Sequence, residues 1–580
     1  MSRQRGPRTR RTVAATAGLT LASVALVAGG AAAAPANDKP RPGDVEIQLL
    51  AFNDYHGHLE ASTPGTIGTT QAGGAEYLAT HLERLRQGHR NSVTVAAGDL
   101  IGGSPFLSGL FHDEPSVESL NALGLDVSGV GNHEFDEGVT ELLRMQNGGC
   151  HPVDGCYFPG APYAGADFQW LAANVRNEQT GKTPLPPYWV QKFQGANVGF
   201  IGMTLEGTDA LVAQSGIQGW KFRDEVETAN ALVPELKKQG VEAIVVLLHE
   251  GGAQTGSYDQ CDGISGPVVD IAKNLDPAID VLLTGHTHQA YNCTIPDPAG
   301  VPRRVTSAAS FGRIVSEINL TISRTTGDVR RDSVTAVNHV VSQDVPRSAA
   351  QTRIIDKWKG LADTVGNSEV GRITADIKRR YEAGGSDDRG AESDLGNMIA
   401  DSQLWATQAN GAQIALMNPG GLRADLLYAR SGAETTDGVV TYAEAFNVQP
   451  FGNLLSTVPM TGDQLHRVLL QQCQPRYLHL GVSAGLTYDV TRQLNGRVCT
   501  PNSIEVTNMR LNGVPIDPAA TYMVTVNNFL VDGGDGFTVF REVDPALRVG
   551  AGIDLDALNA YLRTRGPIAP PGTDRVNELG

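Results

Sequence analysis

Short apolar runs recur through the first half of the chain, and each is followed at once by polar residues. Such runs are typical of buried strands. Stretches that read as helices, residues 75–86 and 225–239, lie between them, and strands that alternate with helices predict an α/β fold. The apolar runs are residues 45–52, 92–97, 125–130, 243–248 and 279–283.

The polar groups that follow these runs carry Asp, Asn or His. Ligands of α/β proteins bind outside the carboxyl ends of strands, so the repeated pattern predicts one shared site. A polar turn with an Asn cap is the alternative for any one group taken alone. In order, the groups are Asp54-Tyr55-His56-Gly57-His58, Gly98-Asp99, Gly131-Asn132-His133-Glu134-Phe135-Asp136, His249-Glu250-Gly251 and Gly285-His286-Thr287-His288.

This ordered set of motifs resembles the calcineurin-like metallophosphoesterases, and more narrowly the secreted 5′-nucleotidases. The resemblance implies a four-layer α/β/β/α sandwich in the N-terminal half and an α/β substrate-binding domain in the C-terminal half. It also implies two divalent metal ions with Asp99 between them. The implied ligands are Asp54, His56, Asp99 and His288 for one ion, and Asp99, Asn132, His249 and His286 for the other. Many relatives have an amide where this chain has His288.

The ligand types narrow the choice of metal. Nitrogen and carboxylate ligands without sulfur favour Zn²⁺ or Mn²⁺ over Ca²⁺. Two such ions would activate a shared water for in-line attack on phosphorus. We expect His133, paired with Asp136, to donate to a phosphoryl or leaving oxygen. We expect His58 and His112 to lie at the surface or behind the ligands.

Glycine-rich turns mark the second half of the chain. Glycine lets a backbone approach a ligand closely, and arginine binds phosphate through two hydrogen bonds. For each phenylalanine beside such a turn, packing in the core is the alternative. The resemblance assigns phosphate to Arg389 and Arg423, ribose hydroxyls to Asn418 and Asp535, and the base to Phe451 and Phe529.

The implied reaction is removal of the 5′-phosphate from a nucleotide. Hydrolysis of cyclic nucleotides, UDP-sugars or a sulfur ester on the same site is an alternative. A binding protein that has lost catalysis is another. The full ligand set and the intact His133–Asp136 pair favour the enzyme.

Charge and the N-terminus bear on partners and location. The net charge of −17 argues against binding of a nucleic acid polymer, which needs a basic surface. Arginines followed by an alanine-rich apolar run and Ala34-Pro35-Ala36 predict a signal peptide over residues 1–36, with a membrane anchor as the alternative. We therefore expect a secreted protein, free or attached to the cell wall, without stable membrane insertion.

Six cysteines complete the prediction. An even number in an exported protein favours disulfides, and proximity predicts the pairs 150–156, 261–293 and 473–499 among the fifteen possible pairings. Zinc binding by thiolates is the alternative, but no Cys-x-x-Cys pair supports it. We expect a catalytic domain over residues 44–345, a linker helix over 346–366, a substrate domain over 367–565 and a loose tail from 563 to 580.

Overall fold

The computed structural model describes residues 43–579 apart from 63, 214–215, 383–384, 432–433, 435, 494–497 and 501–502. The predicted signal peptide lies outside the described residues. Among the described residues, no helix has both the length and the apolar character that crossing a membrane requires.

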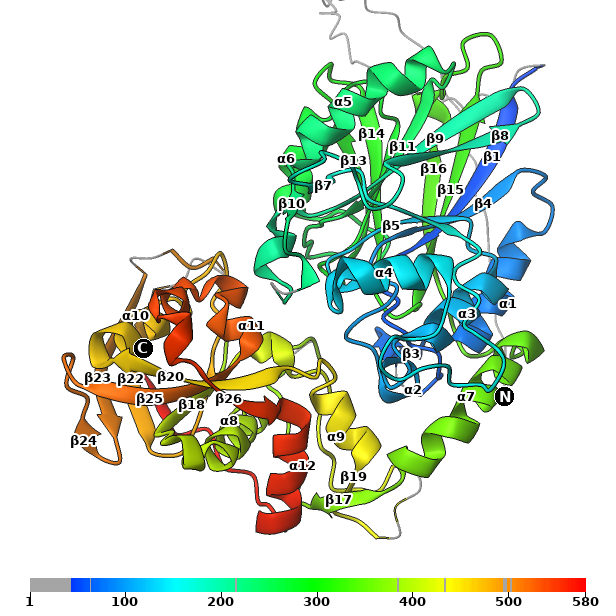
Figure 1. Cartoon of the computed structure of the whole chain (residues 1–580). Helices are drawn as coiled ribbons and strands as arrows, with labels where there is room; N and C mark the ends of the chain where they lie inside the picture. Colours follow the sequence, from blue (N-terminus) through cyan, green and yellow to red (C-terminus); the bar gives the residue numbers. More distant parts are fainter. Residues whose placement is uncertain are drawn as a thin grey trace, which may run out of the picture. The chain divides into compact units, whose positions relative to one another are not determined.

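Two six-stranded sheets form the N-terminal half (Figure 1). The first has the order β16-β15-β1-β4-β5-β6, and the second has the order β13-β14-β12-β11-β9-β8. The strands of the first sheet are β1 (Val45–Phe52), β4 (Ser92–Ala97), β5 (Val127–Gly129), β6 (Gln169–Leu171), β15 (Ile314–Ile322) and β16 (Thr335–Val340). Those of the second are β8 (Tyr188–Phe193), β9 (Ala196–Thr204), β11 (Ala243–His249), β12 (Val281–Thr284), β13 (Ala290–Pro296) and β14 (Pro302–Ala308).

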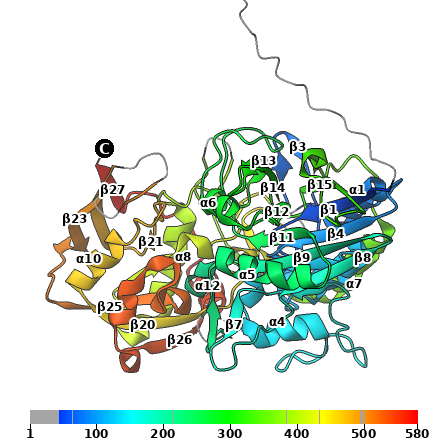
Figure 2. The same ribbon diagram turned by 90° about the horizontal axis from the view of Figure 1, so that it is seen from above.

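Helices cover the outer face of each sheet, which gives the predicted four layers. An apolar core lies between the sheets, with Leu49, Val95, Phe200 and Leu247 at its centre. Three helices pack on the first sheet: α1 (Ala75–Arg86), α3 (Glu114–Leu123) and α4 (Gly138–Asn147). Two pack on the second: α5 (Glu225–Lys238) and α6 (Pro267–Asn274) (Figure 2).

The five predicted strands are present, and their direction places the candidate site. β1 pairs in parallel with β4, and β4 with β5. In the second sheet, β11 pairs in parallel with β12. The carboxyl ends of parallel strands lie at one edge of a sheet, so the polar groups that follow these strands gather there.

The C-terminal half begins with α7 (Ala349–Gly366), where the sequence predicts a connecting helix. A five-stranded sheet follows, with β21 (Gly481–Val482), β18 (Ile414–Met417), β25 (Thr521–Asn527), β20 (Leu454–Thr461) and β26 (Val549–Ile553). A smaller sheet holds β24 (Val514–Pro515), β23 (Ile504–Leu511), β22 (Leu486–Arg492) and β27 (Val576–Leu579). Helices α8 (Asp394–Ala406) and α12 (Asp554–Arg565) pack on one another, and α10 (Gly462–Leu470) packs against β23.

The predicted loose tail is wrong. Helix α12 runs to Arg565, and β27 pairs in parallel with β22 beyond it. Arg575, the residue before β27, forms an ion pair of 2.7 Å with Asp401 and so holds the start of the strand. A strand this short, with only Val576 buried, gives no periodic pattern for a sequence reading to detect.

All three predicted disulfides are present: Cys150–Cys156, Cys261–Cys293 and Cys473–Cys499. No cysteine of the described residues is free. The proximity argument is thus confirmed, and thiolate zinc binding is excluded.

Loss of the Cys473–Cys499 bond should destabilise the protein more than loss of the Cys150–Cys156 bond. The two bonds span 26 and 6 residues, and a longer loop restricts the unfolded chain more. We expect serine replacement of both Cys473 and Cys499 to lower the free energy of unfolding by about 3 kcal/mol, and the matched double replacement at 150 and 156 to cost about 1 kcal/mol less. Urea unfolding followed by circular dichroism measures both; equal losses would contradict the prediction.

Candidate metal centre

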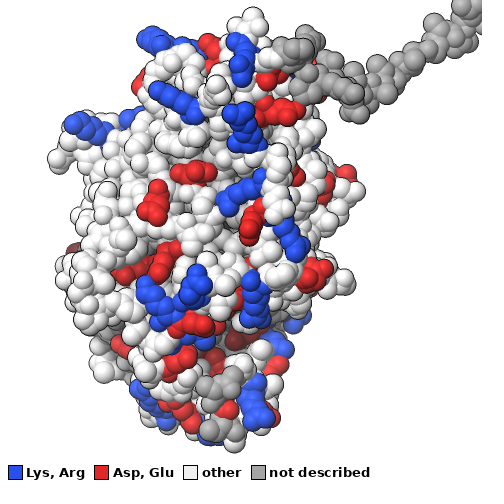
Figure 3. All heavy atoms as spheres, turned by 90° about the vertical axis from the view of Figure 1, so that its right-hand side faces the viewer, with Lys and Arg blue, Asp and Glu red and all other residues white. Residues whose placement is uncertain are grey.

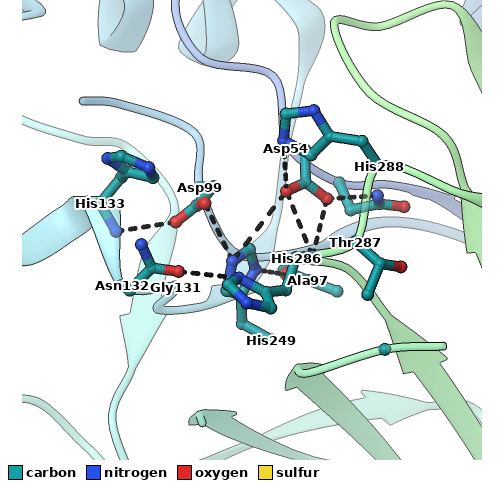
Figure 4. Close-up of polar contacts among 12 residues, drawn as sticks. Asp54, Ala97, Asp99, Gly131, Asn132, His133, His249, His286, Thr287 and His288 are labelled. Carbon is teal, nitrogen blue, oxygen red and sulfur yellow. Dashed lines mark hydrogen bonds and ion pairs between the residues drawn. The ribbon is translucent and has the colours of Figure 1, made fainter. Parts of the chain in front are cut away.

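The predicted ligands come together at the strand ends. Figure 4 shows the side chains of Asp54, Asp99, His249 and His286 directed toward one another. In two groups, the potential ligand atoms lie within 4.8 Å of each other. The groups are Asp54, His56 and His288, and Asp99, His249 and His286.

In the first group, three side chains present lone pairs to one point. His56 Nδ1 donates to the carbonyl of Gly102 at 2.8 Å, which leaves the lone pair on Nε2. That Nε2 lies 3.2 Å from His288 Nε2, and His288 Nε2 lies 3.2 Å from Asp54 Oδ1. A cation between these atoms would satisfy all three.

The second group is built in the same way. His249 Nδ1 donates to the carbonyl of Ala97 at 2.8 Å. Its Nε2 is buried without a hydrogen-bond partner, although it lies 2.9 Å from Asp99 Oδ2. A close approach without hydrogen-bond geometry is expected of two ligands of one cation. Asn132 joins this group, because its Oδ1 lies 3.0 Å from His286 Nδ1.

Asp99 lies between the two groups. Its Oδ2 is 2.9 Å from His249 Nε2 and 3.6 Å from His56 Nε2. Burial holds the pKa values of His56, His286 and His288 below the ordinary value, so these rings are neutral, as metal ligation requires. Although burial opposes it, the Asp99 carboxylate raises the pKa of His249 to about 10, so a cation has to displace a proton there. The donor set of imidazoles and carboxylates therefore fits a pair of divalent ions.

The backbone at these ligands is strained. A non-glycine residue with positive φ costs roughly 1–2 kcal/mol, somewhat less for Asp. Five candidate ligands have this left-handed conformation: Asp54 (φ 49°), His56 (45°), Asp99 (50°), His286 (67°) and His288 (55°). Such residues cluster at functional sites, where the surrounding structure holds them.

His133 and Asp136 form the predicted pair. His133 Nδ1 lies 2.8 Å from Asp136 Oδ2, which leaves Nε2 for another partner. Although burial opposes it, the carboxylates of Asp136 and Asp99 raise the pKa of His133. A nitrogen of His133 also lies within 4.8 Å of ligand atoms of His56 and Asp99, so the pair borders the metal groups directly.

Two residues of the site were missed by the sequence reading. The buried carboxylate of Glu134 accepts backbone hydrogen bonds from Asp99 (2.9 Å), Leu100 (2.7 Å) and Gly131 (2.5 Å), and so fixes the loops that carry the ligands. The ring of Phe311 lies 5.2 Å from that of His288. Glu134 lies inside a motif that the sequence shows; Phe311 follows β14 but carries no polar group to mark it.

His58 and His112, the two histidines that we did not expect to be ligands, differ in burial. His58 is 9% exposed and stacks on Phe311 at 3.9 Å, so it lies behind the ligands and not at the surface. His112 is bonded to Glu137 and Asp154, and although burial opposes it, these carboxylates raise its pKa to about 9. Ligand atoms of His112, Glu137, Glu141 and His151 also lie within 4.8 Å of one another, and the rings of His112 and His151 stack at 3.7 Å.

The predicted substrate residues fall into two sets. Phe451 lies beside the metal groups, with its ring 5.9 Å from that of His133 and with Arg423 5.6 Å above it. Burial and the neighbouring Arg389 lower the pKa of Arg423 to about 10, so it remains charged at neutral pH. In the second set, Asn418 Nδ2 lies 3.2 Å from Asp535 Oδ2.

Phe529 belongs to the second set and packs closely against Gly534, where a Cβ would lie 2.5 Å from the ring. Phe451 instead stacks on His133. A base held between Phe451 and Phe529 therefore stays a prediction.

Comparison with known proteins identifies two family domains and several relatives of this chain. Residues 47–290 match the calcineurin-like phosphoesterase family, and residues 366–542 match the 5′-nucleotidase C-terminal domain. Endonuclease YhcR of Bacillus subtilis is 33% identical over 493 residues, which cover 84% of this chain and 37% of YhcR. Cell wall protein Lmo0130 of Listeria monocytogenes is 32% identical over 552 residues, 91% of this chain and 68% of Lmo0130.

A solved structure of a 5′-nucleotidase precursor from Thermus thermophilus is 25% identical, with a TM-score of 0.72, and covers 92% of this chain and 100% of that one. Stacked sheets with buried His/Asp groups at their strand ends define a metallophosphoesterase. The chain belongs to the 5′-nucleotidase family, with a calcineurin-like phosphoesterase domain followed by a 5′-nucleotidase C-terminal domain.

Proposed function

We propose that this protein is a secreted 5′-nucleotidase that uses two divalent ions, Zn²⁺ or Mn²⁺, to remove the 5′-phosphate from nucleotides. The observation that carries the proposal is the position of Arg423 and Phe451 at His133. A cation suited to phosphate and a ring suited to a base thus stand beside the candidate metal ligands. The likeness to a 5′-nucleotidase precursor along the whole of that chain supports the same substrate class.

The metal ligands divide as the two groups of side chains do. Asp54, His56 and His288 would hold one ion, and Asn132, His249 and His286 the other, with Asp99 shared. When bound, the two ions lower the pKa of a shared water and neutralise charge on the phosphoryl oxygens.

The acid–base step falls to His133. Its Nδ1 is held by Asp136 at 2.8 Å, so Nε2 is the atom that can give a proton to the leaving oxygen. Arg423 and the neighbouring Arg389 bind the phosphate through charge-assisted hydrogen bonds. These roles need the phosphate between the two halves of the chain.

The remaining contacts fit a nucleoside. Asn418 and Asp535 lie side by side, an arrangement suited to two neighbouring ribose hydroxyls. Phe529 offers a second ring for the base. Because Phe451 now stacks on His133, it has to leave that ring before a base can bind between Phe451 and Phe529.

Two further findings bear on location and on the alternative substrate. The three disulfides and the likeness to a cell wall protein support an extracellular site of action. Phosphodiester hydrolysis of nucleic acid is the second candidate, because YhcR is named an endonuclease. The net charge of −17 disfavours it, and on the face in Figure 3 basic side chains are interspersed with acidic ones.

A substrate panel on the mature chain tests the proposal. With Zn²⁺ or Mn²⁺ added in turn, AMP should be hydrolysed with higher kcat/KM than 2′,3′-cyclic AMP, UDP-glucose or single-stranded DNA. Phosphate release and product chromatography measure the four reactions. Faster cleavage of DNA than of AMP would replace the proposal with the nuclease.

Replacing Phe529 with alanine should lower kcat/KM for AMP by roughly 5–150-fold, because stacking of a base on an aromatic ring contributes about 1–3 kcal/mol. Hydrolysis of an aryl phosphate, which has no base, should stay the same. Phe158→Ala is the matched control, since that ring packs on Trp358. Equal losses on AMP and the aryl phosphate would remove Phe529 from the base site.

A further inference from the structure

The glycine turn at 102–103 touches the metal groups. Gly102 accepts the hydrogen bond from His56 Nδ1 at 2.8 Å. A Cβ at Gly102 would lie 2.5 Å from the carbonyl oxygen of His133 and 2.7 Å from Asp136 Oδ2. This turn therefore packs against a candidate ligand and against the acid–base pair at once.

The same turn meets the C-terminal half of the chain. A Cβ at Gly103 would lie 3.3 Å from Arg423 Nη2 and 3.4 Å from the ring of Phe451. Gly102 and Gly103 both have positive φ, 81° and 54°. Two consecutive glycines are conformationally free, so a turn in this position needs a restraint from outside.

Asp113 supplies that restraint. Its Oδ2 accepts the N–H of Gly102 at 2.8 Å, and its Oδ1 accepts the hydroxyl of Ser108 at 2.6 Å. The residue is 7% exposed, so water does not compete for these bonds. Both carboxylate oxygens therefore hold the segment from Gly102 to Ser108, which follows Asp99 in the chain.

Asp113 does not serve its own helix. It occupies the position before α3, where Asp normally accepts a hydrogen bond from the first turn, yet its side chain makes no such cap. Its φ of 60° and that of His112, 50°, are strained for non-glycine residues. The Asp113 carboxylate thus binds the turn at Gly102 instead of capping α3, and its backbone keeps a strained conformation.

We propose that Asp113 is a positioning residue that anchors Gly102, whose carbonyl orients the His56 imidazole, and that fixes the turn against Arg423 and Phe451. The N–H that Asp113 holds and the carbonyl that holds the His56 ring both belong to Gly102, so anchoring the first limits the movement of the second. The inference rests on the proposed role of His56 as a metal ligand.

Two variants test it. Asp113→Asn keeps the shape and tolerates positive φ, whereas Asp113→Gly removes the carboxylate and relieves the strain, so that folding is preserved. Competition with a chromogenic chelator should show affinity for one of the two ions reduced by roughly 10–100-fold in Asp113→Gly, and by less in Asp113→Asn, whose amide oxygen can still accept the Gly102 N–H. The other ion should bind as in the wild type, and kcat should recover when metal is in excess. Ser108→Ala should give a smaller reduction.

Asp297→Asn is the matched control, because this 5% exposed carboxylate accepts backbone hydrogen bonds from Ala299 and Val301. Metal affinities within twofold of wild type in Asp113→Gly, or an equal fall in the control, would overturn the proposal. The metal measurement needs no substrate, so a wild type that binds two ions and hydrolyses no nucleotide would refute the proposed function alone.

Discussion

Replacing Asp99 with asparagine should lower the metal content of the protein and nearly abolish its activity on every substrate. Asp99 Oδ2 lies 2.9 Å from His249 Nε2 and 3.6 Å from His56 Nε2, so one atom faces both metal groups. Asparagine offers a single neutral oxygen in its place and cannot neutralise two cations. Elemental analysis of the purified variant, together with phosphate release from AMP and from an aryl phosphate, measures both effects.

Asp126→Asn is the matched control for this prediction. Asp126 precedes β5, at the end opposite the candidate site, and accepts the backbone N–H of Thr94 at 2.8 Å. Chelation of the wild type should reproduce the loss of activity, and added Zn²⁺ or Mn²⁺ should restore the wild type but not Asp99→Asn. If Asp99→Asn keeps two ions and the wild-type rate, Asp99 is not the shared ligand.

Replacing His133 with asparagine should leave the metals in place and lower kcat by roughly 10²–10⁴, the range for a positioned acid–base group. The Asp136 carboxylate fixes the ring through Nδ1, which leaves Nε2 to act on substrate. Substrates with a good leaving group need less help from an acid and should lose less. Steady-state kinetics on AMP and on aryl phosphates of decreasing leaving-group pKa measure the difference.

His339→Asn is the control for His133, since His339 pairs with Glu317 at 2.9 Å outside the metal groups. The informative alternative is loss of metal. A nitrogen of His133 lies within 4.8 Å of ligand atoms of His56 and Asp99, so a variant that loses an ion would make His133 a ligand.

The sequence predicted the strands of the sandwich and the side chains at their ends for one physical reason. A buried strand must be apolar, so polar residues at its end are conspicuous, as Asp54 is just beyond β1 and His249 at the last position of β11. Parallel pairing then brings those residues to one edge. The roles of Glu134 and Phe311 were not predicted because they depend on tertiary contacts. Glu134 binds three backbone N–H groups, and Phe311 contacts the rings of His58 and His288.

The contacts between the two halves of the chain could not be predicted from the sequence. Nothing in the local pattern at Phe451 indicates that its ring stacks on His133, more than three hundred residues earlier in the chain. The turn at Gly103 shows the same limit: its glycine is visible in the sequence, but its closeness to Arg423 comes only from the tertiary fold.

The left-handed backbone at Asp54, His56, Asp99, His286 and His288 has a cost for folding. Summed over three histidines and two aspartates it amounts to roughly 4–8 kcal/mol, comparable with the net stability of many proteins. Packing of the sandwich around the site has to offset this free-energy cost. Ions that bind only the folded chain offset part of it by mass action. Stability and activity are therefore opposed at these positions: substitutions that relax the backbone would yield a sturdier chain with a poorer catalytic centre.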